Sequence, residues 1–323
     1  MELLRCKMCG GNLNITPDSP IAECLSCGSN VTIPSETDER IINLYNRANY
    51  FRQNNEFDKA IGVFESILNE RATEAEAHWG LVLCKYGVEY VDDPKSQQKV
   101  PTCHRTQFLS ILADPNYKEA INHADGYSRV VYEREASEID QIQKVILEIS
   151  SKEEPFDVFI CYKELDNNGQ RTRDSVDAQD IYYALSREGL KVFFSRITLE
   201  DKIGSAYEPY IFAALNSAKV MVLVSSSREY VDAPWVKNEW GRFLNIIKKD
   251  RTRVLIPAYR NMSPYDFPDE LSYLQAMDMS KIGFIQDLVR GIQKRISIDY
   301  FKFCISIVIF FKNLIIICHI TVA

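Results

Sequence analysis

The sequence predicts a multidomain protein in which a small metal-binding ribbon and an all-α helical module precede an α/β domain with a parallel sheet. Three observations support this prediction. Two Cys-x-x-Cys pairs lie near the start of the chain, apolar residues then recur at helical spacing, and the second half alternates short apolar strands with helices. The chain has 323 residues, which is enough for two or three domains.

The composition is typical of a folded protein, with 46% hydrophobic and 26% charged residues. The formal net charge is −7, and no long basic run occurs. Because binding to phosphates requires clustered Lys and Arg, we expect no nucleic-acid partner. The first ten residues lack the basic and apolar segments of a secretory signal. We therefore expect a cytoplasmic protein.

The four N-terminal cysteines have the spacing of a metal site. Cys6 and Cys9 form one knuckle, and Cys24 and Cys27 form the other. Gaps of two residues let both sulfurs of a knuckle face one ion, and four thiolates close a tetrahedral shell. The odd total of nine cysteines also fits a reducing compartment better than a disulfide framework. We expect a structural Zn²⁺ in a ribbon over residues 1–34, similar to rubredoxin-like zinc ribbons.

The next segment, residues 36–150, carries helical patterns throughout. Ser35 or Thr37 is a candidate cap for its first helix. The stretch FDKAI (57–61) followed by HWGLVLCKYG (78–87) resembles a tetratricopeptide repeat (TPR), in which small and aromatic positions interlock two antiparallel helices. Three regular repeats are absent. We therefore expect a short TPR-like module whose aromatic residues form a core, and a polar loop over residues 92–106.

Residues 155–296 alternate strands and helices after a boundary at Pro155. The expected strands are FDVFICY (156–162), LKVFFS (190–195), KVMVLVSS (219–226) and TRVLIPAY (252–259). The expected helices cover 176–189, 207–218, 235–249 and 281–296. Apolar strands that alternate with helices predict a parallel, flavodoxin-like sheet covered on both faces. Ligands of such sheets bind beyond the carboxyl ends of the strands.

This segment resembles a TIR (Toll/interleukin-1 receptor) domain. The opening strand FDVFICYK, the stretch VFFSRITLEDKIGSAYE and the Trp-x-x-x-Glu of NSAKVMVLVSSSREYVDAPWVKNEW carry the resemblance. The N-terminal ribbon and helical module make the chain similar to bacterial TIR proteins. The Arg-Asp-x-x-Pro-Gly loop of the receptor class is replaced by ITLEDKIG, which speaks against receptor-type contacts.

The resemblance implies an activity and a site. Enzymatic TIR domains cleave NAD⁺ between nicotinamide and ribose with one essential glutamate in an aromatic–Glu pair, which here is Tyr207–Glu208. The substrate-binding candidates are Tyr162, Lys163, Ser195, Arg196, Tyr207 and Trp235. The resemblance also implies self-association through TIR domains and a role in bacterial defence, with the helical module receiving a trigger.

Ordinary structural roles compete with this assignment. Glu208 also suits the first turn of a helix, next to Pro209. Trp235 is equally compatible with a core position. Lys163 and Arg196 are compatible with solvated surface charges. The alternative function is a non-enzymatic adaptor whose TIR domain only binds other TIR domains.

The last segment, 297–323, has an abrupt Ile- and Phe-rich composition with Lys312 near its middle. A membrane anchor, a packed segment and a frameshifted or truncated end are three possible explanations. We favour the last of these, so we expect no membrane partner unless the tail is a genuine anchor.

Overall fold

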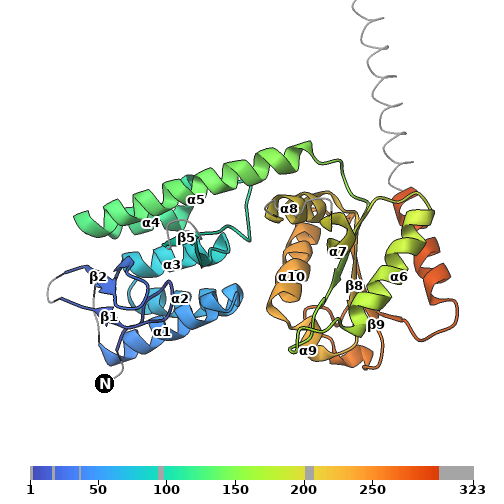
Figure 1. Cartoon of the computed structure of the whole chain (residues 1–323), viewed down its shortest axis with the longest axis horizontal. Helices are drawn as coiled ribbons and strands as arrows, with labels where there is room; N and C mark the ends of the chain where they lie inside the picture. The colour runs from blue at the N-terminus through green and yellow to red at the C-terminus, as the bar shows by residue number, and fades with distance from the viewer. Residues whose placement is uncertain (1–2, 17–18, 36–37, 94–97, 201–206, 298–323) are drawn as a thin grey trace, which may run out of the picture. The chain divides into compact units, whose positions relative to one another are not determined.

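The computed structural model describes residues 3–16, 19–35, 38–93, 98–200 and 207–297. The chain divides into two compact units, which we call the first unit (Met1–Lys152) and the second unit (Glu153–Ala323) (Figure 1). The predictions for the tail, residues 298–323, fall outside the described residues. Within the described ranges, no helix is long and apolar enough to cross a membrane.

The first unit begins with a small antiparallel sheet in the order β1-β2-β3. Its strands are β1 (Leu13–Asn14), β2 (Ile21–Cys24) and β3 (Asn30–Thr32). Gly10 and Gly28 close the two knuckles with φ angles of 76° and 69°. A side chain is strained in this left-handed region, so the glycines are required by the turns themselves.

Helices make up most of the rest of the first unit. They are α1 (Glu39–Gln53), α2 (Phe57–Glu70), α3 (Ala75–Lys85), α4 (Pro115–His123) and α5 (Gly126–Lys152), with the short η1 (Ile111–Ala113). The prediction of an all-helical region is therefore largely correct. The cap of α1 is different from the one predicted, because the Asp38 side chain accepts a hydrogen bond from the Ile41 amide.

Helices α2 and α3 approach each other closely, while the TPR-like character of the module stays a prediction. Gly80 of α3 lies against the Phe64 ring, and a Cβ at Gly80 would stand 2.4 Å from that ring. Phe64 and Trp79 are both buried, which confirms the prediction that the aromatic residues form a core. The predicted polar loop is instead partly a hairpin of β4 (Tyr90–Asp92) and β5 (Lys99–Pro101).

The second unit is a parallel five-stranded sheet in the order β10-β9-β8-β6-β7, with helices on both faces (Figure 1). The strands are β6 (Val158–Tyr162), β7 (Val192–Phe193), β8 (Val220–Ser225), β9 (Val254–Tyr259) and β10 (Met277–Asp278). The helical elements are α6 (Arg173–Arg187), α7 (Ser195–Thr198), α8 (Glu208–Ser217), α9 (Arg228–Val231), α10 (Pro234–Lys249), η3 (Pro264–Asp266) and a helix over 284–297. This arrangement confirms the predicted parallel α/β sheet.

Both faces of the sheet are buried, as the apolar strands predicted. Phe159 and Cys161 pack into a cluster that contains residues of α8 and α10. Val158 and Ile160 pack on the opposite face with residues of α6 and of the helix over 284–297. Every residue of β6 and of its neighbour β8 is buried, so these two strands form the centre of the sheet.

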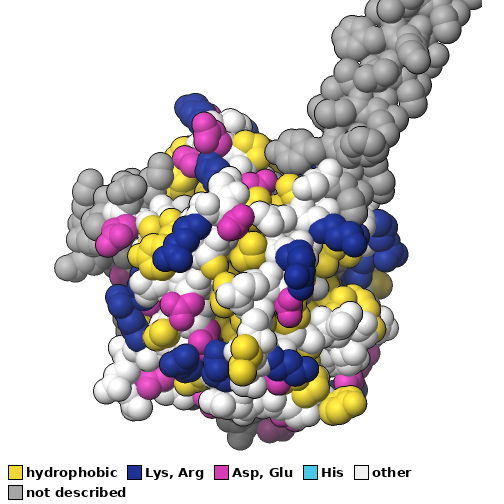
Figure 2. All heavy atoms as spheres, turned by 90° about the vertical axis from the view of Figure 1, so that its right-hand side faces the viewer, with side chains coloured by type: hydrophobic (Ala, Val, Ile, Leu, Met, Phe, Trp, Pro, Cys, Tyr) yellow, Lys and Arg dark blue, Asp and Glu magenta, His cyan; other side chains and the backbone are white. Residues whose placement is uncertain are grey.

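The surface of the second unit carries both signs of charge. On the face shown in Figure 2, basic and acidic side chains are interspersed with hydrophobic ones, and neither sign covers the face continuously. A nucleic-acid surface requires a continuous basic stripe. This face is therefore not suited to binding a phosphate backbone.

Candidate functional site

The ends of β6 and β7 meet at the carboxyl edge of the sheet. These strands are parallel neighbours, so the segments that follow them lie on the same side. The Tyr162 hydroxyl lies 3.0 Å from Oγ of Ser195, and it also donates a hydrogen bond to Glu164. The Tyr162 ring stacks on Phe194 with centroids 5.1 Å apart. Two predicted site residues, Tyr162 and Ser195, are thus in direct contact.

The surroundings of the Tyr162 hydroxyl favour its protonated form. Burial raises the pKa of Tyr162, and the hydrogen bond to the Glu164 carboxylate raises it further. A neutral phenol at this edge acts as a hydrogen-bond donor and as an apolar stacking surface.

The two cationic candidates have different surroundings. Arg196 donates a hydrogen bond to Oε1 of Gln179 on α6, and its guanidinium lies 5.5 Å from the Phe194 ring centroid. Lys163 is half-buried, and its carbonyl oxygen accepts a hydrogen bond from Thr172. Arg196 is therefore held against the Tyr162–Phe194 stack, whereas within the described ranges Lys163 is tied only through its backbone.

Glu208 is the first residue of α8, directly after the N-cap residue Tyr207. Helix α8 leads into β8, which is parallel to β6 and β7, so the helix runs back across the sheet and starts at its carboxyl edge. Glu208 is half-buried and Tyr207 is 47% exposed. The segment 201–206 that precedes this pair lies outside the described residues.

Trp235 occupies the start of α10, the helix that follows β8. Its side chain is 43% exposed, so it is not a core residue. Glu239, one turn further along, is half-buried beside Cys161 of β6. Burial raises the pKa of Glu239 to about 7, against the opposing effects of the Cys161 thiol and Arg242. Glu239 is thus a packed residue at the sheet, in agreement with a structural role.

A buried carboxylate near this edge was missed by sequence reasoning. Asp174, in the first turn of α6, has no exposed surface, and neither of its oxygens has a hydrogen-bond partner of ordinary geometry among the described residues. Burial raises its pKa to about 6, although the nearby Ser226 hydroxyl acts in the opposite direction. In sequence, Asp174 has the pattern of an ordinary first-turn acid, so no signal distinguished it.

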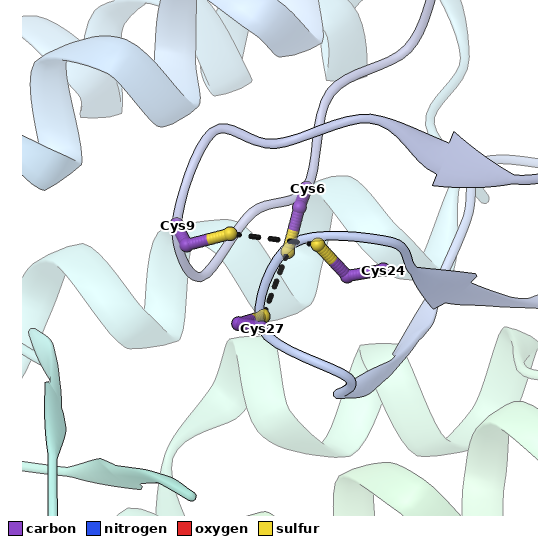
Figure 3. A group of neighbouring side chains, drawn as sticks. All are labelled: Cys6, Cys9, Cys24 and Cys27. Atoms are coloured by element: carbon purple, nitrogen blue, oxygen red, sulfur yellow. Dashed lines mark hydrogen bonds between the residues drawn. The ribbon is translucent and has the colours of Figure 1, made fainter. Parts of the chain in front are cut away.

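The four N-terminal cysteines converge, as Figure 3 shows. Their sulfurs all lie within 4.8 Å of one another, with 4.0 Å between Cys6 and Cys27 and 3.5 Å between Cys9 and Cys24. A tetrahedral ion with Zn–S bonds of about 2.3 Å separates its sulfurs by about 3.8 Å. The donor set and its spacing therefore fit Zn²⁺.

Backbone amides support the thiolate form of this cluster. The amides of Met8, Gly11 and Ser26 each lie 3.4 Å from a cysteine sulfur. At Cys24, burial is outweighed by hydrogen bonds from the Cys27 and Ser26 amides, and its pKa falls to about 7. Burial raises the pKa of Cys9 to about 11, so without a cation this thiol stays protonated at neutral pH.

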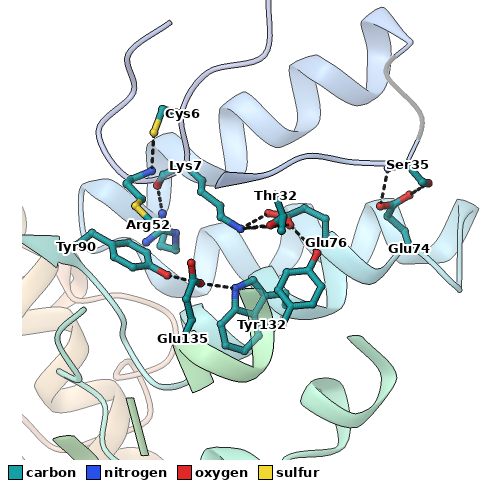
Figure 4. Close-up of polar contacts among 12 residues, drawn as sticks. Cys6, Lys7, Thr32, Ser35, Arg52, Glu74, Glu76, Tyr90, Tyr132 and Glu135 are labelled. Carbon is teal, nitrogen blue, oxygen red and sulfur yellow. Dashed lines mark hydrogen bonds and ion pairs between the residues drawn. The ribbon is translucent and has the colours of Figure 1, made fainter. Parts of the chain in front are cut away.

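Buried polar contacts attach the first knuckle to the helices (Figure 4). The Lys7 ammonium lies 2.9 Å from Oε1 of Glu76 in α3 and 2.6 Å from Oγ1 of Thr32. Glu76 also accepts a hydrogen bond from the Tyr132 hydroxyl of α5. The guanidinium of Arg52 in α1 donates to the Lys7 carbonyl. The ribbon and the helices consequently share one buried polar core.

Comparison with known proteins assigns the second unit. Residues 158–290 match the family model described as "TIR domain". This region is a TIR domain. The match begins at the first residue of β6 and ends in the helix over 284–297.

Among curated proteins, none matches the chain. A metazoan TIR-STING receptor from C. gigas, in complex with 2′,3′-cGAMP, is among the solved structures that are similar to the chain. The two chains are 19% identical with a TM-score of 0.33, and the alignment covers 42% of this chain and 39% of that receptor. The chain therefore spans about two fifths of the length of the receptor. A likeness at this level carries no conclusion about ligands.

Proposed function

We propose that the TIR domain cleaves NAD⁺ at the bond between nicotinamide and ribose, by hydrolysis or cyclisation, with Glu208 as the catalytic residue. The observation that supports this most is the location of the Tyr207–Glu208 pair, which starts α8 at the carboxyl edge of the parallel sheet. In doubly wound sheets this edge is where nucleotides bind.

One carboxylate is sufficient for this chemistry. Nicotinamide departs from a pyridinium that already carries a positive charge, so the leaving group needs no proton. The ribosyl carbon develops oxocarbenium character as the bond breaks, as in glycoside hydrolysis. A fixed carboxylate beside that carbon and hydrogen-bonded to the ribose hydroxyls stabilises the transition state more than the ground state.

The neighbouring residues supply substrate contacts. The Tyr162–Ser195 pair offers hydroxyls at the end of β6 and in the segment after β7. Tyr207 and Trp235 expose aromatic surface at the starts of α8 and α10 and are suited to stacking on nicotinamide or adenine. Lys163 and Arg196 are the cationic candidates for the pyrophosphate. Since Arg196 already bonds Gln179, Lys163 is the better placed of the two.

Nicotinamide release tests this function. The full chain is incubated with NAD⁺ at high protein concentration or with a crowding agent, and products are separated by chromatography. We expect nicotinamide together with linear or cyclic ADP-ribose from the wild type, and none from Glu208→Gln. Glu200→Gln is a matched control, because Glu200 is an exposed carboxylate two residues beyond α7 and its loss should leave turnover intact.

The alternative function is a scaffold that only binds other TIR domains, because TIR domains self-associate in both classes. A scaffold releases no nicotinamide even when assembled, and Glu208→Gln leaves its association unchanged. Sedimentation velocity on the wild type and on Glu208→Gln, run beside the turnover assay, separates the two functions.

The first unit has a supporting role in this proposal. Cys6, Cys9, Cys24 and Cys27 hold a structural Zn²⁺, and with four protein thiolates the shell has no open position for catalysis. The helical module receives a protein trigger that promotes TIR assembly. Such a protein would act in the cytoplasm, in bacterial defence, by depleting NAD⁺ or by producing a cyclic signal.

A further inference from the structure

The first unit contains a cavity of about 720 Å³ that none of the functions above uses. Its walls come from the ribbon, from the segment before α1, and from the N-terminal turns of α3 and α5. The residues that matter for its chemistry are Ser35, Glu74, Glu76, Asp125, Tyr127 and Tyr132. A volume of this size is typical of a small-molecule site.

The charge of the lining has one sign. Three carboxylates, those of Glu74, Glu76 and Asp125, line the cavity, and none of its described lining residues is Lys or Arg. All three carboxylates accept hydrogen bonds within the protein, and Glu76 also has a cationic partner. Glu76 pairs with Lys7, and the Asp125 side chain accepts hydrogen bonds from the amides of Tyr127 and Ser128 at the start of α5.

Glu74 is different. Its residue is only 4% exposed, and its carboxylate accepts hydrogen bonds from the amide and the hydroxyl of Ser35 (Figure 4). Among the described residues no Lys or Arg pairs with it. A buried carboxylate without a cation is costly, and a positive ligand in the adjoining space would relieve that cost.

Aromatic rings complete the site. Tyr127 and Tyr132 both line the cavity. The Tyr132 ring is buried, with the Lys7 ammonium 5.7 Å from its centroid and Trp79 packed beside it, whereas Tyr127 is 72% exposed and is the ring that a ligand can reach. Carboxylates beside phenol rings are the surroundings that recognise organic ammonium groups. Phosphates and nucleotides need basic donors, which this lining lacks.

We propose that this cavity binds a small organic cation, a primary amine whose ammonium group pairs with Glu74 and packs against Tyr127. Binding in this cavity does not depend on the activity of the TIR domain. The ligand of the first unit would then belong to a different chemical class from NAD⁺.

A charge-matched series of probes tests the proposal on the full chain. Isothermal titration calorimetry compares 1,4-diaminobutane, 1,4-butanediol and succinate, which share a four-carbon chain and differ in charge. The measurements are all made at one buffered pH near 8 and at one ionic strength. We expect saturable binding of the diamine with a dissociation constant of about 1 mM or lower. The diol and succinate should bind at least about tenfold more weakly, a difference of about 1.4 kcal/mol.

Two variants and a control locate the site. Glu74→Gln and Tyr127→Ala should each weaken diamine binding, the first by about tenfold or more. Tyr127 is 72% exposed, so its loss does not endanger the fold. Glu65→Gln, at an exposed position on α2, should bind like the wild type. No diamine binding to the wild type, equal binding of the diol or succinate, or unchanged binding to both cavity variants would overturn the proposal.

Discussion

The Lys7 ammonium and the Glu76 carboxylate form a buried ion pair, 2.9 Å apart and 4% and 6% exposed. Lys7 lies between the two cysteines of the first knuckle, and Glu76 lies in the first turn of α3. The pair therefore connects the candidate metal site to the helical core. This relationship makes the stability of the ribbon inseparable from that of the helices.

Metal removal should unfold more than the ribbon. We expect one zinc per chain by elemental analysis of the full protein, and loss of helical circular dichroism from the first unit when a strong chelator removes it. Cys9→Ser should lower both the zinc content and the helical signal. A chain that contains no zinc, or that keeps its full helical signal after zinc is removed, would contradict this.

Breaking the buried ion pair should be strongly destabilising. Glu76→Gln leaves the Lys7 charge buried without its partner, which typically costs about 3–5 kcal/mol of unfolding free energy. The matched control is Glu70→Gln, which breaks the exposed Arg40–Glu70 pair and should cost about 0–1 kcal/mol. Urea titration measures both. Similar small losses in the two variants would show that the buried pair does not hold the knuckle.

Two glycines on neighbouring helices should respond in opposite directions to the same change. Gly80→Ala forces a Cβ into the Phe64 ring, and overpacking of this kind costs about 1–3 kcal/mol. Gly62→Ala meets no atom within 4 Å and removes a helix-destabilising glycine, so it should stabilise by about 0.5–1 kcal/mol. Thermal unfolding of both variants checks the prediction. A harmless Gly80→Ala would mean that α2 and α3 do not pack this closely.

Asp174 should make the second unit less stable as the pH rises. Its folded pKa of about 6 exceeds the ordinary value of 3.8, so the folded state retains a proton that the unfolded state releases. The free energy of unfolding therefore falls between about pH 4 and pH 6, by up to about 3 kcal/mol from this residue. In Asp174→Asn this fall in the free energy of unfolding should be absent.

Denaturation of Asp174→Asn at pH 4 and pH 8 tests this sign. The variant should gain stability over the wild type at pH 8, and the gain should shrink towards pH 4. Asp180→Asn, at an exposed position on α6, should show no such trend. A loss of stability at pH 8 in Asp174→Asn would instead mean that the ionised carboxylate is stabilised, for example by Ser226.

The spacing of the apolar residues and the composition of the segments were sufficient to predict most of the fold. The apolar stretches at 156–162 and 219–226 can be buried on both faces only inside a covered parallel sheet, and β6 and β8 occupy them. The helical spacing around Phe64 and Trp79 likewise required a packed module. The shortest strands were not predicted. The β4–β5 hairpin and β10 consist of two or three residues per strand, which is too short for any period to be visible.

The candidate site was only partly predictable, because sequence gives the edge of the sheet and not the local environment. The topology brings Tyr162 and Ser195 together because they follow neighbouring strands. The exposure of Trp235 and the burial of Asp174 depend on how α10 and α6 rotate against the sheet, which helical spacing alone does not fix. The bond from Arg196 to Gln179 is a long-range contact of the same kind.

The most direct test of the central claim separates catalysis from binding at Glu208. Turnover of NAD⁺ and the dissociation constant of NAD⁺ are measured on the full chain for the wild type and Glu208→Gln at the same protein concentration. A carboxylate that acts on the transition state predicts a turnover lower by about 10²–10³ or more, with little change in the dissociation constant. Equal turnover in the two proteins, or no turnover in either under conditions of assembly, would contradict the account and leave Glu208 as a residue that only starts a helix.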